Sequence, residues 1–223
     1  MSARYRPMIL NAFPEYAWPD LQRRARYGVQ LADDLIQERT ILDWVVGHDQ
    51  RGDLRRVGVM WSIHQACIDG VLPFSATTKK NTAKNCHHVE VTSQNIYLHI
   101  TRTPSLLSLP RDTTLRDNER ASNQGDLFSD TGFTTDLSTI RRWYAWLTFG
   151  ADPKGDLTHL AIGLPKHGEN DWLEIVSILR PTGEIQSTDE EPRPPGPEDS
   201  VKFRAAVQKL LTPPADRDQV EES

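Results

Sequence analysis

The sequence predicts an α+β protein in which an N-terminal helical layer packs on a mainly antiparallel sheet of about five strands. Two observations carry this prediction. Apolar residues recur at spacings of three and four through residues 18–70, which is typical of amphipathic helices. Polar and apolar residues alternate over residues 86–102, and three short apolar segments separated by turn residues follow over residues 143–179.

The helical region begins at Trp18-Pro19-Asp20, where the proline suits the first turn of a helix. It continues to Gly47 as one long helix or as two helices that break near Arg39-Thr40. A second helix is expected to run from Asp53, a favourable N-cap residue, to Gly70. The apolar stripes of these helices indicate a helical hairpin or a bent helical layer.

A β-hairpin with two unlike faces is predicted over residues 86–102, with Ser93 and Gln94 as its loop. One face is expected to join the core, and it holds mostly apolar residues: His87, Val89, Val91, Ile96, Leu98 and Ile100. The other face holds the densest collection of chemically capable side chains in the sequence: Cys86, His88, Glu90, Tyr97, His99 and Thr101.

Three further strands are predicted at Trp143–Phe149, Leu157–Leu164 and Trp172–Leu179, with turn residues between them. The first of these strands carries bulky side chains on both faces. We therefore expect it to be central and covered on both sides.

Two segments between these elements are expected to be loops. Residues 75–85 are polar and basic. Residues 103–140 carry no clear strand, although Arg111–Asn123 could form one polar helix. A connection of this length is uncommon inside a compact domain unless it is functional or mobile.

The charge of the chain is concentrated at its C-terminal end. Residues 181–223 carry ten acidic and five basic residues, so the other 21 acidic and 21 basic residues balance over residues 1–180. Residues 181–200 combine prolines with acids and are predicted to be a linker. Residues 201–223 are predicted to hold a short amphipathic helix and a disordered tail. We therefore expect one α+β domain over residues 1–180 with a tethered C-terminal helix.

Composition narrows the classes of protein that the chain can belong to. The mean hydropathy is −0.56, and no apolar stretch is long enough to span a membrane. Cys67 and Cys86 are too few for a disulfide framework, and no secretory signal is visible, so the cytoplasm is the expected location. The balanced charge of residues 1–180 argues against a strong nonspecific nucleic-acid binder and leaves such contacts to local basic patches.

The polar face of the hairpin is the candidate site for chemistry. In the predicted register His88 lies opposite His99, with Glu90 beside them. Two imidazoles and a carboxylate about 5 Å apart across strands can bind a zinc-like divalent metal or carry protons. The alternative interpretation is a solvated polar face without a ligand.

Further contacts are expected around this face. Tyr97 would orient a substrate or partner. Lys79, Lys80 and Lys84 precede the hairpin, and they would steer phosphate groups if they converged with the arginines of the helices. Because acidic residues are interspersed, we expect most of this basic surface to be ordinary and solvated.

No familiar motif assigns a reaction. The sequence lacks a P-loop, a dinucleotide-binding glycine motif, an HExxH zinc motif, paired Cys-x-x-Cys and Gly-x-Ser-x-Gly. The preferred hypothesis is therefore a non-enzymatic binding or regulatory protein without a cofactor. It would recognise a macromolecular partner, above all another protein, through the sheet face and through Phe203 and Leu210 of the C-terminal helix.

The second hypothesis is a small metal-dependent or acid–base hydrolase, for example a nuclease. Its metal ligands or proton carriers would be His88, His99 and Glu90. Exposed strand edges would also permit a homodimer under either hypothesis.

Overall fold

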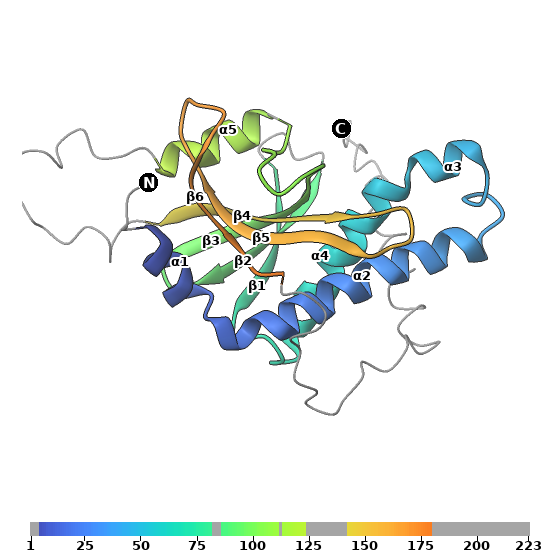
Figure 1. Cartoon of the computed structure of the whole chain (residues 1–223), viewed down its shortest axis with the longest axis horizontal. Coiled ribbons are helices and arrows are strands. Elements are labelled where there is room, and N and C mark those ends of the chain that lie inside the picture. Colours follow the sequence, from blue (N-terminus) through green and yellow to red (C-terminus); the bar gives the residue numbers. More distant parts are fainter. Residues whose placement is uncertain (1–4, 82–85, 112, 124–141, 180–223) are drawn as a thin grey trace, which may run out of the picture.

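The computed structural model describes residues 5–81, 86–111, 113–123 and 142–179, and it has the predicted α+β architecture (Figure 1). The helices are α1 (Tyr5–Ala12), α2 (Trp18–Glu38), α3 (Val45–Asp49), α4 (Arg51–Ile68) and α5 (Thr114–Arg120). The strands are β1 (Ser75–Lys80), β2 (His87–Ser93), β3 (Ile96–Arg102), β4 (Trp143–Ala151), β5 (Leu157–Pro165) and β6 (Trp172–Ser177).

The strands form one six-stranded sheet in which their spatial order follows the order of the chain, β1 to β6. Neighbouring strands are antiparallel except β3 and β4, which are parallel. The mainly antiparallel sheet of the prediction is thus confirmed, with one strand more than expected. In the described part of the chain, no helix combines the length and the apolar composition needed to cross a bilayer.

One face of the sheet carries the apolar core, and α1, α2 and α4 cover it (Figure 1). Alternate residues of the strands point into this core. In the hairpin, Val89, Val91, Ile96, Leu98 and Ile100 point into the core as the sequence pattern predicted, whereas His87, the sixth residue expected on this face, is exposed at the start of β2.

The two long helices on this face touch backbone to backbone at a pair of glycines. A Cβ atom at Gly58 would lie 2.2 Å from the carbonyl oxygen of Gly28. An ion pair joins the same two helices. The buried guanidinium of Arg55 on α4 donates to both carboxylate oxygens of Asp33 on α2, at 2.8 and 2.6 Å. It also donates to the carbonyl of Asp152 in the β4–β5 turn, at 2.7 Å. The helix pair is therefore tied to the sheet as well as packed on it.

The opposite face of the sheet is polar and aromatic, and the crossover from β3 to β4 covers it with α5 (Figure 1). Tyr144 and Trp146 of β4 have no exposed surface. The side chain of Asn123, just after α5, accepts from the Tyr144 amide at 2.8 Å. It donates to the carbonyls of Tyr144 and Pro165 at 2.7 and 2.9 Å. The prediction that β4 is central and covered on both sides is thus confirmed.

The register of the hairpin differs from the prediction. Glu90, and not His88, lies opposite His99, and the loop is Gln94-Asn95. The hydroxyl of Ser93 donates to the carbonyl of Ala12, which holds Ser93 in β2 and moves the turn one residue along the chain. The resulting shift of two residues in the pairing leaves every side chain on its predicted face.

Residues 75–85 were expected to form a loop, but Ser75–Lys80 form the edge strand β1. Thr78 and Lys79 pair with Val89 and His88 of β2. Polar and apolar residues do not alternate in this strand, because nearly every residue of β1 is exposed, and the sequence therefore did not indicate a strand. Lysines on an edge strand discourage pairing with other chains, which explains the polar sequence.

Other differences concern the limits of helices. The second long helix begins at Arg51 and not after Asp53, and α1 lies in a segment for which no helix was expected. The polar helix predicted within Arg111–Asn123 is the shorter α5, which Thr113 caps through its side chain. The predicted linker and tail over residues 181–223 lie outside the described residues.

The glycine contact between α2 and α4 predicts a large effect of one methyl group. Gly58→Ala should lower the free energy of unfolding by about 1–3 kcal/mol, because the new Cβ would overlap backbone atoms that cannot rotate away. This loss would outweigh the gain of about 1 kcal/mol in helix propensity. Urea unfolding measures the effect, with Gln30→Ala at an exposed position of α2 as the matched control. A Gly58→Ala variant as stable as the wild type would contradict the contact.

Candidate functional site

A line of polar contacts crosses the sheet face beneath α5. The indole Nε1 of Trp146 donates to the hydroxyl of Tyr144, which lies 3.1 Å from Nδ1 of His99. Because an indole N–H can only donate, the Tyr144 hydroxyl can in turn donate its proton to Nδ1. This assignment leaves the proton of a neutral His99 on Nε2, 3.9 Å from Oε2 of Glu90.

Glu90 is a buried carboxylate among cationic groups. Its Oε1 accepts from Nζ of Lys79 at 2.7 Å and from Nη2 of Arg142 at 3.1 Å. His99, Lys79 and Arg142 together hold the pKa of Glu90 at about 2, although burial opposes them. Since a general acid or base works best with a pKa near the operating pH, Glu90 is poorly suited to carry protons at neutral pH.

His88 remains next to His99 despite the shifted register. The two imidazole centroids are 4.2 Å apart, with the rings at 61°. Burial and the neighbouring His99 lower the pKa of His88 to about 4, so this imidazole is neutral at physiological pH. Among the described residues, no three or more His, Cys, Asp and Glu side chains are grouped so that they could hold a metal ion. The geometry therefore gives no support to a metal site at His88, His99 and Glu90.

Three histidines, His87, His88 and His99, line a cavity of about 610 Å³, which we call the histidine cavity. Its apolar wall is formed by Met60, Ile100, Leu115 and Trp146. The polar residues around it, besides the histidines and Cys86, include Asn81, Thr101, Thr113, Thr114 and two arginines, Arg56 and Arg116.

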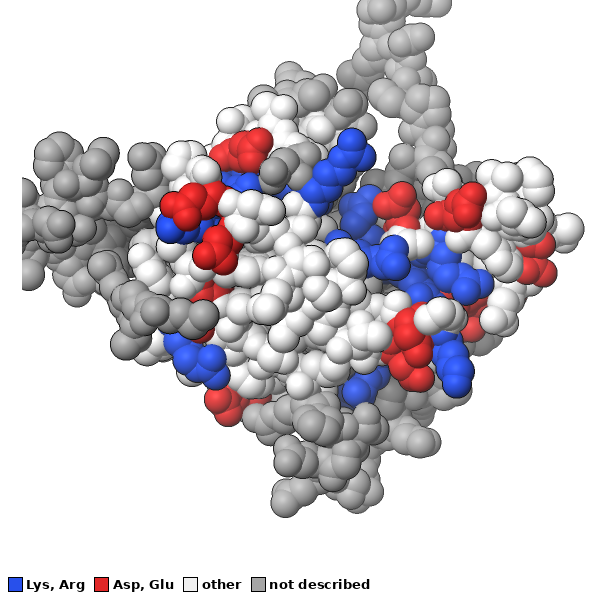
Figure 2. Space-filling view, turned by 45° about the horizontal axis from the view of Figure 1, so that its top comes forward, with Lys and Arg blue, Asp and Glu red and all other residues white. Residues whose placement is uncertain are grey.

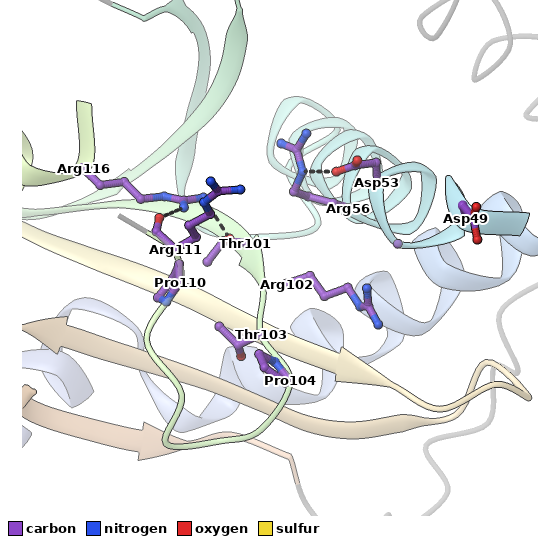
Figure 3. Close-up of a pocket in the computed structure, with 11 residues that line it drawn as sticks. Asp49, Asp53, Arg56, Thr101, Arg102, Thr103, Pro104, Pro110, Arg111 and Arg116 are labelled. Atoms are coloured by element: carbon purple, nitrogen blue, oxygen red, sulfur yellow. Dashed lines mark hydrogen bonds and ion pairs between the residues drawn. The ribbon is translucent and has the colours of Figure 1, made fainter. Parts of the chain in front are cut away.

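A second cavity of about 380 Å³ adjoins the first and shares Arg56, Thr101 and Arg116 with it. Four arginines line this cavity, and Asp49 and Asp53 lie at one side of it (Figure 3). We call it the arginine cleft, after Arg56, Arg102, Arg111 and Arg116. Figure 2 shows basic side chains gathered on the α3 side of the molecule, with acidic side chains interspersed among them.

The arginines of the cleft come from three parts of the fold. Arg56 lies on α4, where its Nε is 3.5 Å from Oδ1 of Asp53. Arg116 reaches from α5 and donates to the Thr101 hydroxyl at 3.2 Å and to the carbonyl of Arg111 (Figure 3).

Arg102 and Arg111 are the least compensated of the four. Within the described part of the chain, their side chains make no hydrogen bond and no ion pair. The guanidinium of Arg102 lies over Gly52, where a Cβ atom would be only 2.3 Å from Nη1. Gly52 belongs to the first turn of α4, which is the positive end of the helix dipole and therefore adds to the local positive potential. The arrangement is suited to an anion.

The structure separates the other predicted binding residues from these cavities. Tyr97 is buried beneath α5 and donates to Oε2 of Glu119 at 2.5 Å, while Arg142 stacks on its ring. Lys79 is paired with Glu90, and Lys80 is exposed on β1 and lines neither cavity. Three further predicted residues, Lys84, Phe203 and Leu210, lie outside the described residues.

Sequence reasoning did not single out Arg102, Arg111 or Arg116. Arg102 ends a strand, and the other two arginines belong to residues 103–140. The one indication of function in that segment was its unusual length without a clear strand. That length is itself a mark of functional connections. Arg56 was among the candidate phosphate contacts, but its neighbour Arg55 is a structural residue bound to Asp33.

No family model, no curated protein and no solved structure matches the chain.

The environment of Glu90 predicts a pH-dependent contribution to stability. A carboxylate whose pKa falls from 4.5 in the unfolded chain to about 2 in the folded one stabilises the fold fully above pH 4.5. This contribution disappears as the pH falls toward 2. Glu90→Gln should lower the free energy of unfolding at pH 7 by about 1–2 kcal/mol and flatten its dependence between pH 4.5 and 2.

Denaturant unfolding at a series of pH values tests this expectation. The matched control is Glu169→Gln, which alters an exposed carboxylate paired with Lys166. If Glu90→Gln and the control had the same pH profile, the buried ion-pair assignment would be wrong.

Proposed function

We propose that the chain is a non-enzymatic binding protein that recognises an anionic segment of a partner protein in the arginine cleft. The observation that carries the proposal is the uncompensated charge of Arg102 and Arg111 beside Arg56 and Arg116. Guanidinium groups are the side chains best suited to bind carboxylate or phosphate groups by paired hydrogen bonds.

An exposed apolar surface next to the cleft supports a protein partner. Ile41, Trp44, Val45 and Val46 are 77, 55, 80 and 51% exposed, and we call them the apolar tip. Val45 and Asp49 lie one turn apart on α3, and Asp49 lines the arginine cleft. Tryptophan and arginine are the residues most often found at the energetic centres of protein interfaces, so the tip and the cleft fit one contact surface.

The distribution of charge favours a protein over a nucleic acid. The arginine cleft is a local cavity with Asp49 and Asp53 at one side, which would repel a continuous phosphate backbone but tolerate one or two anionic groups. Residues 1–180 carry equal numbers of acidic and basic residues. A nucleic acid would be expected to select a more extended basic surface.

The hydrolase hypothesis receives less support. Glu90 is ionised and held by two cations, and its low pKa makes it a poor proton carrier at neutral pH. The described residues offer no group of three or more metal ligands. Binding by the arginines requires neither a metal nor a proton transfer.

Affinity capture with the full chain tests the proposal. We expect a partner protein from cell extract to be retained by the wild type and by the control variant Lys154→Glu, which changes an exposed charge away from the cleft. The double variant Arg102→Glu/Arg111→Glu should lose it. With the purified partner, Trp44→Ala should weaken binding by about tenfold or more, and added salt should weaken it further.

Three results would contradict the proposal. The first is a partner whose capture is unaffected by the arginine and Trp44 variants. The second is captured material that nuclease treatment releases, which would identify a nucleic acid as the partner. The third is that the wild type and the double variant retain the same proteins from the extract.

A further inference from the structure

The two adjoining cavities also have the composition of a site for a small ligand, and we propose that this ligand is a nucleoside phosphate. Its base would occupy the histidine cavity, and its phosphates would lie against Arg56 and Arg116. This ligand goes beyond the proposed partner protein, since its binding requires only this chain.

The size and lining of the histidine cavity are the first support. Its volume of about 610 Å³ falls in the range of small-molecule sites, which are mostly apolar with a few convergent polar groups. Among its apolar lining residues Leu115 is the one that is partly exposed, and together with the half-buried imidazole of His88 it offers surface to an aromatic ring. The hydroxyl group of Thr114 lies at the same cavity, where the edge of a base needs hydrogen-bonding partners.

An unsatisfied polar atom is the second, independent support. His99 is only 7% exposed and lines the cavity, yet its Nε2 has no hydrogen-bond partner among the described residues. The nearby Oε2 of Glu90, at 3.9 Å, is too distant for a hydrogen bond. A buried donor without a partner costs about 1–3 kcal/mol. A ring nitrogen or carbonyl oxygen of a base is an acceptor that would satisfy it.

The position of the shared arginines is the third support. Arg56 and Arg116 line both cavities, so an anionic group attached to a ligand in the histidine cavity can reach them without leaving the site. Arg102 and Arg111 lie further into the arginine cleft and would meet a second phosphate. A phenyl phosphate would fill the apolar wall and reach the arginines, but its ring offers no acceptor for His99. The polar groups of the cavity therefore favour a base over a simple aromatic ring.

Isothermal titration calorimetry with the full chain tests the inference. The probes are ADP, GDP, CDP and UDP, with pyrophosphate and the four nucleosides as controls. We expect at least one nucleoside diphosphate to bind about tenfold more tightly than pyrophosphate, because the base adds contacts of its own. His99→Phe, which keeps a flat ring but removes both nitrogens, should reduce this affinity about tenfold and leave pyrophosphate binding unchanged.

A second variant protects the test against a folding defect at His99. Leu115→Trp adds bulk to the wall of the cavity without altering a polar group, and it should abolish the preference for nucleotides over pyrophosphate. The inference is overturned if no diphosphate binds more tightly than pyrophosphate, or if Leu115→Trp leaves the preference intact. Neither result would affect the proposed partner protein, because no partner takes part in the measurement.

Discussion

The parallel pairing of β3 with β4 is the constraint on which the rest of the site depends. Parallel neighbours cannot be joined by a tight turn, so the chain must cross from one end of the sheet to the other. The described part of this crossover lies over the polar face, where Asn123 binds backbone groups of β4 and β5. It carries Arg111 and Arg116 to the end of β3, where Arg102 lies. Without this path the arginines would not share a cavity.

Two opposite electrostatic arrangements lie near each other, one on the polar face of the sheet and one in the arginine cleft, between α4 and the residues that follow β3. Glu90 is buried, and Lys79 and Arg142 neutralise it at hydrogen-bond distance, as a carboxylate removed from water requires. The arginine cleft has an excess of cations, and Arg102 and Arg111 have no acidic partner in the described part of the chain. The first arrangement is complete in the folded chain and is therefore structural. In the second, Arg102 and Arg111 have no acidic partner among the described residues, and this is the physical basis of the proposed function.

The sequence allowed the fold to be predicted much further than the site. The alternation over residues 86–102 placed His88, His99 and Glu90 on one face, because the period of two survives a register shift of two residues. It could not show that Glu90 pairs with Lys79 of β1 and with Arg142, the residue before β4, since those contacts join distant segments. The arginine cleft was missed for the same reason: Arg102 and Arg116 approach each other only because the crossover folds back over β3. Apolar periodicity records burial, and it carries no information about which exposed charges converge.

The central claim is that the cleft binds an anion, and NMR of the arginine Nε–H groups tests it most directly. Inorganic phosphate would be titrated into the full ¹⁵N-labelled chain at constant ionic strength. We predict that the signals of Arg102 and Arg111 shift and saturate together with one dissociation constant, while that of Arg23, which is paired with Asp20 near the start of α2 and does not line the cleft, does not. Shifts of equal size at all three arginines, or shifts that never saturate, would contradict a specific anion site.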